Sequence, residues 1–424
     1  YGSLTGKDAA FGVATRKGVL LAIEEINAKG GVLGRPLAYL VEDIQSKQGE
    51  SATAVKKLIS RDKVVAVIGA NTSANSLEAA PICQNSQIPM MAISSTNPRV
   101  TEVGDYIFRI CFIDPFQGAV LAKFAHTSLK AKRVALLTAV NSPYSVGLSA
   151  VLRQDFTARG GEIIAEQKYN EGEKDFRAQL TAIKAANVDA IFIPGYYTEA
   201  ALVARQARSL GLTMPLFGGD GWESEKLLEI GGEALNGSYY STHFTPENKE
   251  PAVATFVKKF KARWKNETPD AYAALGYDAL YVLVDAIKRS GVTEGPKLRD
   301  AIAATKNFSG ASGVTTLDQN RNASKPATII AVKGGKAVML DVSETEWGPV
   351  TREVDKRVSL ALRWVAQEPG ALNLGLNGVT RSRSLDEALL AAESTGIPGQ
   401  NLVIGDKNGR IAWRLTAQMP KRVG

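Results

Sequence analysis

Three loops that follow apolar, strand-like runs carry side chains suited to holding a small charged molecule. Ser73, Ser94 and Thr96 come shortly after two such runs, and Asp220 ends a third. Hydroxyls and the free N–H groups of a helix N-terminus can hold a carboxylate, and a carboxylate side chain can neutralise an ammonium. Ligands of open α/β sheets sit beyond the carboxyl ends of the strands. The set therefore predicts recognition of a zwitterion such as an α-amino acid.

Each of these polar residues also has a purely structural interpretation. Ser73 stands where a helix begins and could be its N-cap. Ser94 and Thr96 could be turn residues, and Asp220 could cap the helix expected at 223–231. For Ser73, binding a ligand and capping the helix are compatible roles. For Ser94, Thr96 and Asp220, the ligand-binding and the structural interpretations both remain open.

Residues for other kinds of chemistry are sparse. The chain has two cysteines, Cys83 and Cys111, and two histidines, His126 and His243, without CxxC or HxxxH spacing. No GxSxG, HExxH, P-loop or GxGxxG motif occurs. We therefore expect no catalytic residue, no metal and no cofactor, and we expect free core thiols in preference to a disulfide. His126 lies mid-helix and His243 near a predicted crossover. Neither context is typical of a histidine in a catalytic triad.

The overall composition indicates a globular chain of two or three domains. It has 424 residues, 45% of them hydrophobic, and a net charge of +8 that is spread along the chain. Spread charge favours solvated helix faces over a nucleic-acid surface. No apolar run of 18 residues is present, so we expect no membrane span.

Residues 15 to about 340 alternate apolar strand-like runs with amphipathic helical segments. "VVAVIGA" is one such run, "PLAYLVED" is another expected strand, and "TRKGVLLAIEEINA" (15–28) is an expected helix. A second series starts after "DPFQG", and long helices follow it at 251–266 and 270–290. This pattern predicts the α/β class, with two doubly wound parallel-sheet lobes.

Three segments resemble the type I periplasmic binding proteins, in particular the leucine/isoleucine/valine-binding proteins of ABC importers. They are "GVATRKGVLLAIEEINAKGGVLGRPL", "VVAVIGANTSANSLEAAPICQNSQIPMM" and "NEGEKDFRAQLTAIKAANVDAIFIPGYYTEAALVARQARSLGL". The resemblance covers roughly residues 1–340. It implies two lobes that close on a ligand and are joined by three crossovers, expected at 112–116, 243–247 and 315–328.

The same resemblance implies the lobe boundaries and a ligand. One lobe would comprise 1–114 and 246–318, and the other 115–245 and 319–341. The ligand would be a branched-chain or other aliphatic amino acid, gripped by Ser73, Ser94, Thr96 and Asp220. An aspartate at position 220 is shorter than the glutamate usual in the family, which leaves the exact ligand open.

Four aromatic residues match positions that wall the ligand pocket in this family. Tyr144 and Tyr196 lie in loops after expected strands, Phe11 lies in the opening loop, and Tyr272 lies in "PDAYAALGYDAL". Each alone could be an ordinary core or surface aromatic. Together they form a plausible apolar wall with polar handles.

The family also implies partners and a location. We expect a periplasmic protein, or an extracellular and lipid-anchored one, that docks on the membrane permease subunits of an ABC importer. No signal peptide is visible, and we expect a strand and any export signal to precede Tyr1. We expect neither nucleic-acid binding nor a direct membrane span.

Residues 343–424 resemble a second family, the penicillin acylase type of N-terminal-nucleophile hydrolases. The matching pieces include "ETEWGPV", "SLALRWVAQEPGALN", "RSRSLDEALLAAESTGIPGQN" and "LVIGDKNGRIAWRL". An α+β fragment is expected, with Ser384 and Glu387 forming a capping box, an Asn-Gly hairpin near the end, and exposed apolar residues such as Trp364 and Trp413.

The catalytic parts of that second family are missing. Its nucleophile is a serine in a Ser-Asn-x-Trp context, which does not occur here. We therefore expect a chimera, with a seam at 341–343 and a non-catalytic C-terminal segment. The alternatives are an amidohydrolase relationship through this segment and a regulatory ligand-binding module, which would need an attached DNA-binding or membrane segment.

Overall fold

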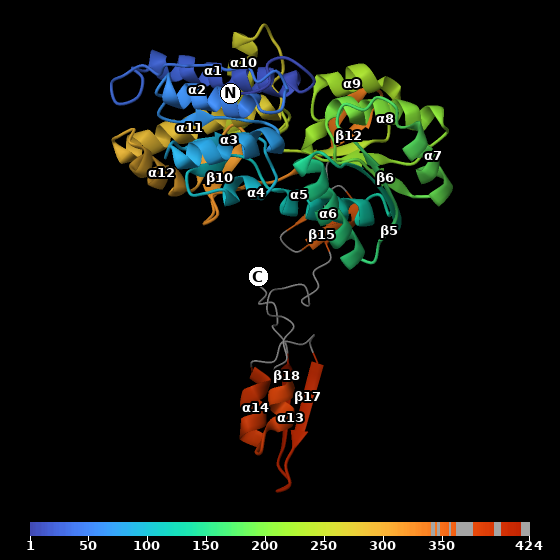
Figure 1. The fold of residues 1–424 in the computed structure, drawn as a ribbon. Helices are drawn as coiled ribbons and strands as arrows, with labels where there is room; N and C mark the ends of the chain where they lie inside the picture. The colour runs from blue at the N-terminus through green and yellow to red at the C-terminus, as the bar shows by residue number, and fades with distance from the viewer. Residues whose placement is uncertain (341–343, 346–347, 356–357, 362–375, 394–399, 417–424) are drawn as a thin grey trace. The chain divides into compact units, whose positions relative to one another are not determined.

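The chain divides into two compact units, Tyr1–Leu340 and Asp341–Gly424. A computed structural model describes the following residues: 1–340, 344–345, 348–355, 358–361, 376–393 and 400–416. The proposed seam at 341–343 therefore lies outside the described residues. Figure 1 shows the course of the chain.

The first lobe of unit 1–340 is built on a small parallel sheet whose order is β1-β2-β3. These strands are mostly buried and consist largely of apolar residues, as expected for a sheet covered on both faces. The elements of the first lobe are α1 (Ala9–Ala28), α2 (Glu50–Ser60), β1 (Val67–Ile68), α3 (Ser73–Asn85), β2 (Met90–Ala92), α4 (Arg99–Glu102), β3 (Ile107–Arg109), α10 (Pro251–Arg263), α11 (Ala271–Ser290), α12 (Gly295–Ala303), β9 (Phe308–Gly310), β10 (Gly313–Leu317) and β11 (Ala323–Ser324).

Glycines let α1 and α11 pack closely in this lobe. A Cβ at Gly18 would lie 1.9 Å from the carbonyl oxygen of Ala273, and a Cβ at Gly276 would lie 2.6 Å from that of Thr15. Side chains at these positions would force the two helices apart. The long apolar face of α11 can therefore bury itself against α1, which places the start of α11 beside the first lobe's strand ends.

The second lobe carries a seven-stranded sheet in the order β13-β12-β8-β7-β6-β4-β5. The strands from β8 to β5 pair in parallel, and β12 and β13 add an antiparallel hairpin at one edge. Its elements are α5 (Asp114–Thr127), β4 (Arg133–Ala139), α6 (Pro143–Ala158), β5 (Glu162–Tyr169), α7 (Arg177–Ala186), β6 (Ala190–Phe192), α8 (Tyr197–Ser209), β7 (Leu216–Gly218), η1 (Asp220–Trp222), α9 (Glu225–Gly231), η2 (Gly232–Leu235), β8 (Tyr239–Thr242), β12 (Thr328–Lys333) and β13 (Lys336–Met339). Figure 1 shows α5 to α9 gathered in this lobe.

These two sheets with their covering helices confirm the predicted fold class. The chain passes between the lobes three times, after β3, after β8 and after β11. The third passage differs in detail from the sequence-based division. β11 pairs with β10, and Arg109 N–H donates to the carbonyl of Arg321, so residues 319–324 belong with the first lobe's strands.

Two expected elements differ from the structure. The segment 36–43, expected as a strand, has no ladder partner beyond an isolated bridge between Gly2 and Asp43. It is extended, but a strand needs a neighbouring strand to pair with. Helix α1 begins at Ala9, earlier than the expected start at residue 15.

The described part of the second unit contains the predicted strands, helix and hairpin, and also helix α13, which the sequence reasoning did not assign. The elements are β14 (Glu344–Thr345), β15 (Gly348–Asp355), β16 (Val358–Ala361), α13 (Leu376–Arg381), α14 (Leu385–Glu393), β17 (Gln400–Gly405) and β18 (Ile411–Thr416). β17 and β18 form the predicted hairpin, whose turn is closed by Gly409 N–H donating to Asp406 over 3.1 Å. Gly409 adopts a φ of 82°, the left-handed region that favours glycine.

The cap of α14 is nearly the predicted one. Ser384 Oγ accepts from Glu387 N–H at 3.2 Å, but the Glu387 carboxylate accepts from Arg383 N–H instead of from the cap residue itself. Trp413 is 63% exposed, as the sequence suggested. The expectation for Trp364 lies outside the described residues.

Candidate functional site

A cavity lies between the two lobes of unit 1–340, at the carboxyl ends of the strands. Its empty volume is about 210 Å³. The first lobe lines it with Phe11, Asn71, Ser73, Ser94 and Tyr272, and the second with Tyr144, Tyr196, Asp220 and Gly221. All of the predicted site residues except Thr96 are therefore brought to one place.

Ser73 lies at the N-terminus of α3 and is its first helical residue. The cap is Thr72, whose side chain accepts from Asn75 N–H at 3.4 Å, so the interpretation of Ser73 as the N-cap was wrong. Ser73 Oγ accepts from Asn97 N–H at 3.3 Å. A cap is already in place, so the Ser73 hydroxyl and N–H are positioned for another partner at a helix end that favours anions.

The loop that carries Ser94 is held by hydrogen bonds from the buried side chain of Arg109. Arg109 is fully buried, and its guanidinium donates to the carbonyls of Ser95, Asn97 (2.9 Å) and Pro98 (3.1 Å). Burial lowers the pKa of Arg109 from its ordinary value. These bonds hold the backbone after β2 in one shape, which fixes the direction of the Ser94 side chain.

Thr96 is the predicted residue that the structure leaves out of the cavity. It is fully buried, and its carbonyl accepts from Asp114 N–H at 2.9 Å where the chain enters α5. Asn71 takes a place that the sequence reasoning did not assign. Its side-chain nitrogen donates to Ser94 Oγ at 3.2 Å. Both hydroxyl-bearing loops are thus joined through Asn71.

Asp220 ends the loop after β7 and is 3% exposed. Helix α9 is capped by Ser224, which accepts from Lys226 N–H at 3.1 Å, so the interpretation of Asp220 as the helix cap was wrong. Its Oδ1 accepts from Tyr144 OH at 3.0 Å, and its Oδ2 lies 3.0 Å from His243 Nε2. No lysine or arginine among the described residues bonds to this carboxylate, so it can accept a ligand cation.

Aromatic rings form the rest of the cavity wall. Tyr144 and Tyr196 are stacked with centroids 5.3 Å apart, and Phe11 lies 4.6 Å from Tyr272 and 5.7 Å from Tyr196. Burial raises the pKa of each of these tyrosines well above its usual range, so their hydroxyls stay protonated. The wall is apolar on its ring faces and carries donors at its edges.

Contacts across the cavity show that the lobes are closed on each other. Tyr272 OH donates to the carbonyl of Asp220 at 2.8 Å, and Asn97 Nδ2 donates to the carbonyl of Pro143 at 2.7 Å. Phe11 and Tyr272 belong to the same hydrophobic cluster as the second lobe's core. Ligand enclosed here would be shielded from water, which strengthens every polar contact with it.

Sequence reasoning also missed His243. It was set aside because it seemed to offer no catalytic material, but its buried ring contacts Asp220. No local signal in the sequence could have found it, because the contact depends on the parallel pairing of β7 and β8, which brings the residues after each strand to the same edge of the sheet. Asp220 follows β7 and His243 follows β8.

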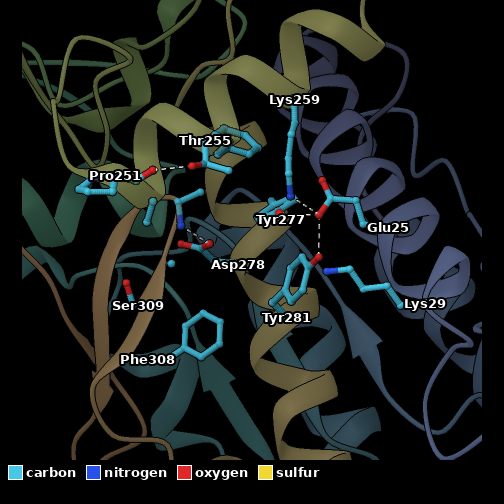
Figure 2. A pocket seen from close by; sticks show the side chains of 14 residues that line it. Glu25, Lys29, Pro251, Thr255, Lys259, Tyr277, Asp278, Tyr281, Phe308 and Ser309 are labelled. Atoms are coloured by element: carbon cyan, nitrogen blue, oxygen red, sulfur yellow. Dashed lines mark hydrogen bonds and ion pairs between the residues drawn. The ribbon is translucent and has the colours of Figure 1, made fainter.

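A second, larger recess of about 760 Å³ lies within the first lobe, between α1, α10, α11 and β9 (Figure 2). Its acidic groups are already compensated by the protein. Glu25 Oε2 accepts from Lys259 (2.8 Å), Tyr277 (3.0 Å) and Tyr281 (2.8 Å), and the buried Asp278 accepts from Ala311 N–H at 2.6 Å. The smaller cavity, whose acid has no lysine or arginine partner among the described residues, is the better candidate for binding a cation.

Other chemistry is not supported by the described parts of the chain. Cys83 and Cys111 are free and buried, as preferred from the sequence, and burial raises the pKa of each to about 12. Among the described residues, no cluster of three His, Cys, Asp or Glu side chains could hold a metal, and no helix has the length and apolarity needed to cross a membrane.

Known proteins match the chain in two stretches. A family model described as periplasmic binding protein matches residues 1–337. The chain belongs to the periplasmic binding protein family. Among its relatives, the Leu/Ile/Val-binding protein homolog 2 of Brucella abortus (strain 2308) is 31% identical over 74% of this chain and 84% of that protein. The leucine-, isoleucine-, valine-, threonine- and alanine-binding protein of Pseudomonas aeruginosa is 30% identical over 72% and 80%.

Solved structures of the family resemble the fold. The leucine-binding protein LivK of Thermotoga maritima has a TM-score of 0.78 and 42% identity, over 80% of this chain and 96% of that one. LivJ of Streptococcus pneumoniae, solved with isoleucine, has a TM-score of 0.75 and 32% identity, over 80% and 98%.

The second match confirms the other predicted resemblance. A family model described as penicillin amidase matches residues 295–424, so it overlaps the first match over 295–337. The overlap belongs structurally to unit 1–340. Leu298 and Ile302 of α12 are buried in the first lobe's core, and β12 lies inside the second lobe's sheet.

Proposed function

We propose that this periplasmic binding protein takes up an aliphatic amino acid between its lobes as the solute-binding subunit of an ABC importer. The observation that carries the proposal is the position of Asp220, a buried carboxylate that bonds to Tyr144 and His243 but to no lysine or arginine among the described residues. Across the cavity from it, the first lobe offers Ser73 at a helix N-terminus and Ser94.

This arrangement suits an α-amino acid better than an anion alone. A ligand ammonium can bond to Asp220, and a ligand carboxylate can accept from the hydroxyls and from the N-terminus of α3. Arg109 is near the hydroxyl loop, but its terminal nitrogens donate to backbone carbonyls. The rings of Phe11, Tyr144 and Tyr196 leave an apolar surface for an aliphatic side chain.

Calorimetric titration with the twenty amino acids tests the proposal. We expect leucine, isoleucine or valine to bind, because relatives are Leu/Ile/Val-binding proteins. Asp220→Asn keeps the side chain's shape and removes its charge, so affinity should fall about ten- to one-hundred-fold, the weight of a hydrogen bond to a charged group. Asp220→Ala should do at least as much.

Asp175→Ala is the matched control, because it removes an exposed carboxylate of the second lobe, with the side chain 57% accessible. Its affinity should equal that of the unchanged protein. Equal affinities for Asp220→Asn and the control would remove Asp220 from the site. Absence of binding to any aliphatic amino acid would refute the proposed function.

The importer role places the protein outside the cytoplasmic membrane and makes permease subunits its partner. The family of its relatives and structural neighbours supports both parts of this proposal. The amino-acid-loaded protein should stimulate ATP hydrolysis by a branched-chain amino acid importer reconstituted in liposomes. The empty protein should stimulate it less. If neither form stimulates hydrolysis, the result argues against this partner.

The C-terminal segment takes no catalytic part in this proposal. It matches the penicillin amidase model, but the chain has no Ser-Asn-x-Trp sequence to supply a nucleophile. The full chain should therefore leave a chromogenic phenylacetyl anilide unhydrolysed. Hydrolysis that survives repeated purification would favour the alternative of an amidohydrolase.

A further inference from the structure

His243 lies where two of the passages between the lobes meet. It follows β8 directly, and its side chain is completely buried. Its ring packs on Phe112, which precedes α5 on another passage, with centroids 3.7 Å apart and a tilt of 33°. The imidazole is therefore held from its face as well as by its position in the chain.

The polar edge of this ring points at the acid of the cavity. His243 Nε2 is 3.0 Å from Asp220 Oδ2, while Nδ1 is buried without a hydrogen-bond partner among the described residues. A carboxylate accepts and does not donate, so Nε2 carries the hydrogen.

The Asp220 carboxylate is thereby fixed at both oxygens. Tyr144 OH holds Oδ1 at 3.0 Å and His243 holds Oδ2, while the Asp220 N–H donates to Gln117 Oε1 at 2.8 Å. Each carboxylate oxygen can accept a further hydrogen bond. A ligand donor therefore meets an acid whose plane is already set and loses little entropy in ordering it.

We propose that His243 is a positioning residue that orients the Asp220 carboxylate toward the ammonium group of the bound amino acid. This inference rests on the proposed function. His243 should therefore affect only the binding of the ligand's ammonium group, because its ring contacts Asp220 and does not line the cavity.

Two substitutions separate the hydrogen bond from the packing. His243→Phe keeps a ring against Phe112 and removes the donor. His243→Gln places an amide nitrogen near the position of Nε2, and so restores a donor to Asp220. Thermal unfolding without ligand shows whether each variant is folded.

The readout compares leucine with 4-methylpentanoate, which has the same side chain and carboxylate but no ammonium. Ligand-observed NMR covers the weak binding expected for the second compound. His243→Phe should weaken leucine binding about tenfold, the order of one hydrogen bond to a charged group, and leave 4-methylpentanoate unchanged. His243→Gln should recover most of the lost leucine affinity. The double variant carrying His243→Phe and Asp220→Asn should bind leucine as weakly as Asp220→Asn alone.

The outcomes separate the two proposals. If His243→Phe weakens both ligands equally, or neither, His243 has a structural role or none and the inference is overturned. If the unchanged protein binds no aliphatic amino acid, the proposed function itself fails, and these variants are not needed to show it.

Discussion

The buried carboxylate of Asp220 is held in part by groups that do not line the cavity. Gln117 holds its backbone and His243 holds one of its oxygens, yet neither lines the cavity. Sequence reasoning could find Asp220 because it ends an apolar strand. It could not rank its neighbours, since which strands pair, and therefore which loops meet, is decided by tertiary structure.

Which of the predicted hydroxyl side chains reach the cavity also depends on tertiary contacts. Ser73 and Ser94 reach the cavity, whereas Thr96 turns inward in the loop that leads toward α5. Residues in one short loop point in different directions, and the direction depends on anchors distant in the sequence. Arg109 is such an anchor, and nothing in its own sequence context announces that its guanidinium is buried.

The hydroxyl of Tyr272 forms a hydrogen bond between the lobes, and its removal should change ligand release. Its hydroxyl donates from the first lobe to the carbonyl of Asp220 in the second, so this bond exists only while the lobes are together. Tyr272→Phe keeps the ring contact with Phe11 and removes the bond. Amino-acid affinity should fall about fivefold, the weight of roughly 1 kcal/mol, mainly through faster dissociation measured by stopped-flow fluorescence.

Tyr281→Phe is the control for that substitution, because its hydroxyl belongs to the recess within the first lobe. It should leave the dissociation rate unchanged. A Tyr272→Phe protein that releases its ligand at the original rate would show that this bond does not hold the lobes together.

At the scale of elements, the N-terminus of α11 meets the loop after β7. Ala271 N–H donates to Glu223 Oε1 at 2.8 Å, and Thr242 Oγ1 donates to Oε2. Burial, with a smaller effect from Asp270, raises the pKa of Glu223 from its ordinary 4.5 to about 8. The carboxyl group is therefore largely protonated at neutral pH in the closed form.

This shift gives closure a pH dependence. If Glu223 meets water when the lobes part, its pKa returns toward 4.5, and closing takes up a proton between those values. The contribution of Glu223 to closure is then full below about 4.5 and lost as pH rises through 8. Calorimetry at pH 7 in buffers of different ionisation enthalpy should show proton uptake on amino-acid binding.

Glu223→Gln should reduce that uptake, because an amide keeps the hydrogen-bonding shape without titrating. Glu166→Gln, at a carboxylate that is 45% exposed, is the matched control and should change nothing. Burial raises the pKa of Asp8 to about 7 and that of Asp270 to about 6, so each would add to the uptake if opening exposes it as well. Uptake that is identical in Glu223→Gln and the control would contradict the assignment.

The elements themselves were largely predictable, since apolar runs and helical periodicity are local properties. The strands in the cores and the long helices lie where the pattern placed them, within a few residues at the ends, apart from the early start of α1 at Ala9. The segment 36–43 was another exception, because its residues favour a strand but, among the described residues, its β-bridge is a single one to Gly2. Pairing partners are long-range, and no local pattern states whether one exists.

At the scale of the whole molecule, the described fold separates the binding unit from the C-terminal segment. Residues 328–339 complete the second lobe's sheet, and the boundary between units follows at residue 340. A chain ending at Leu340 should bind the amino acid with unchanged affinity and unfold cooperatively. Calorimetry and thermal denaturation on both lengths measure this.

A chain ending at Ser324 is the contrasting truncation. It lacks β12, whose residues Ile330, Ala331 and Val332 are buried, so the second lobe would expose β8 as an unpaired edge. We expect it to aggregate or to lose binding. Failure of the chain ending at Leu340, with binding intact in the full chain, would show that the C-terminal segment supports the site.

The order of strands in the second lobe also bears on how the chain folds as it is synthesised. β12 pairs with β8, but the entire sequence from α10 to β11 is made between them and belongs to the first lobe. At roughly 5–20 residues per second, β8 waits several seconds on the ribosome for its neighbour. Neither lobe can be completed early, so each emerging chain presents apolar strand edges for that interval. The free edge of β8 is covered only when β12, which ends at Lys333, has emerged.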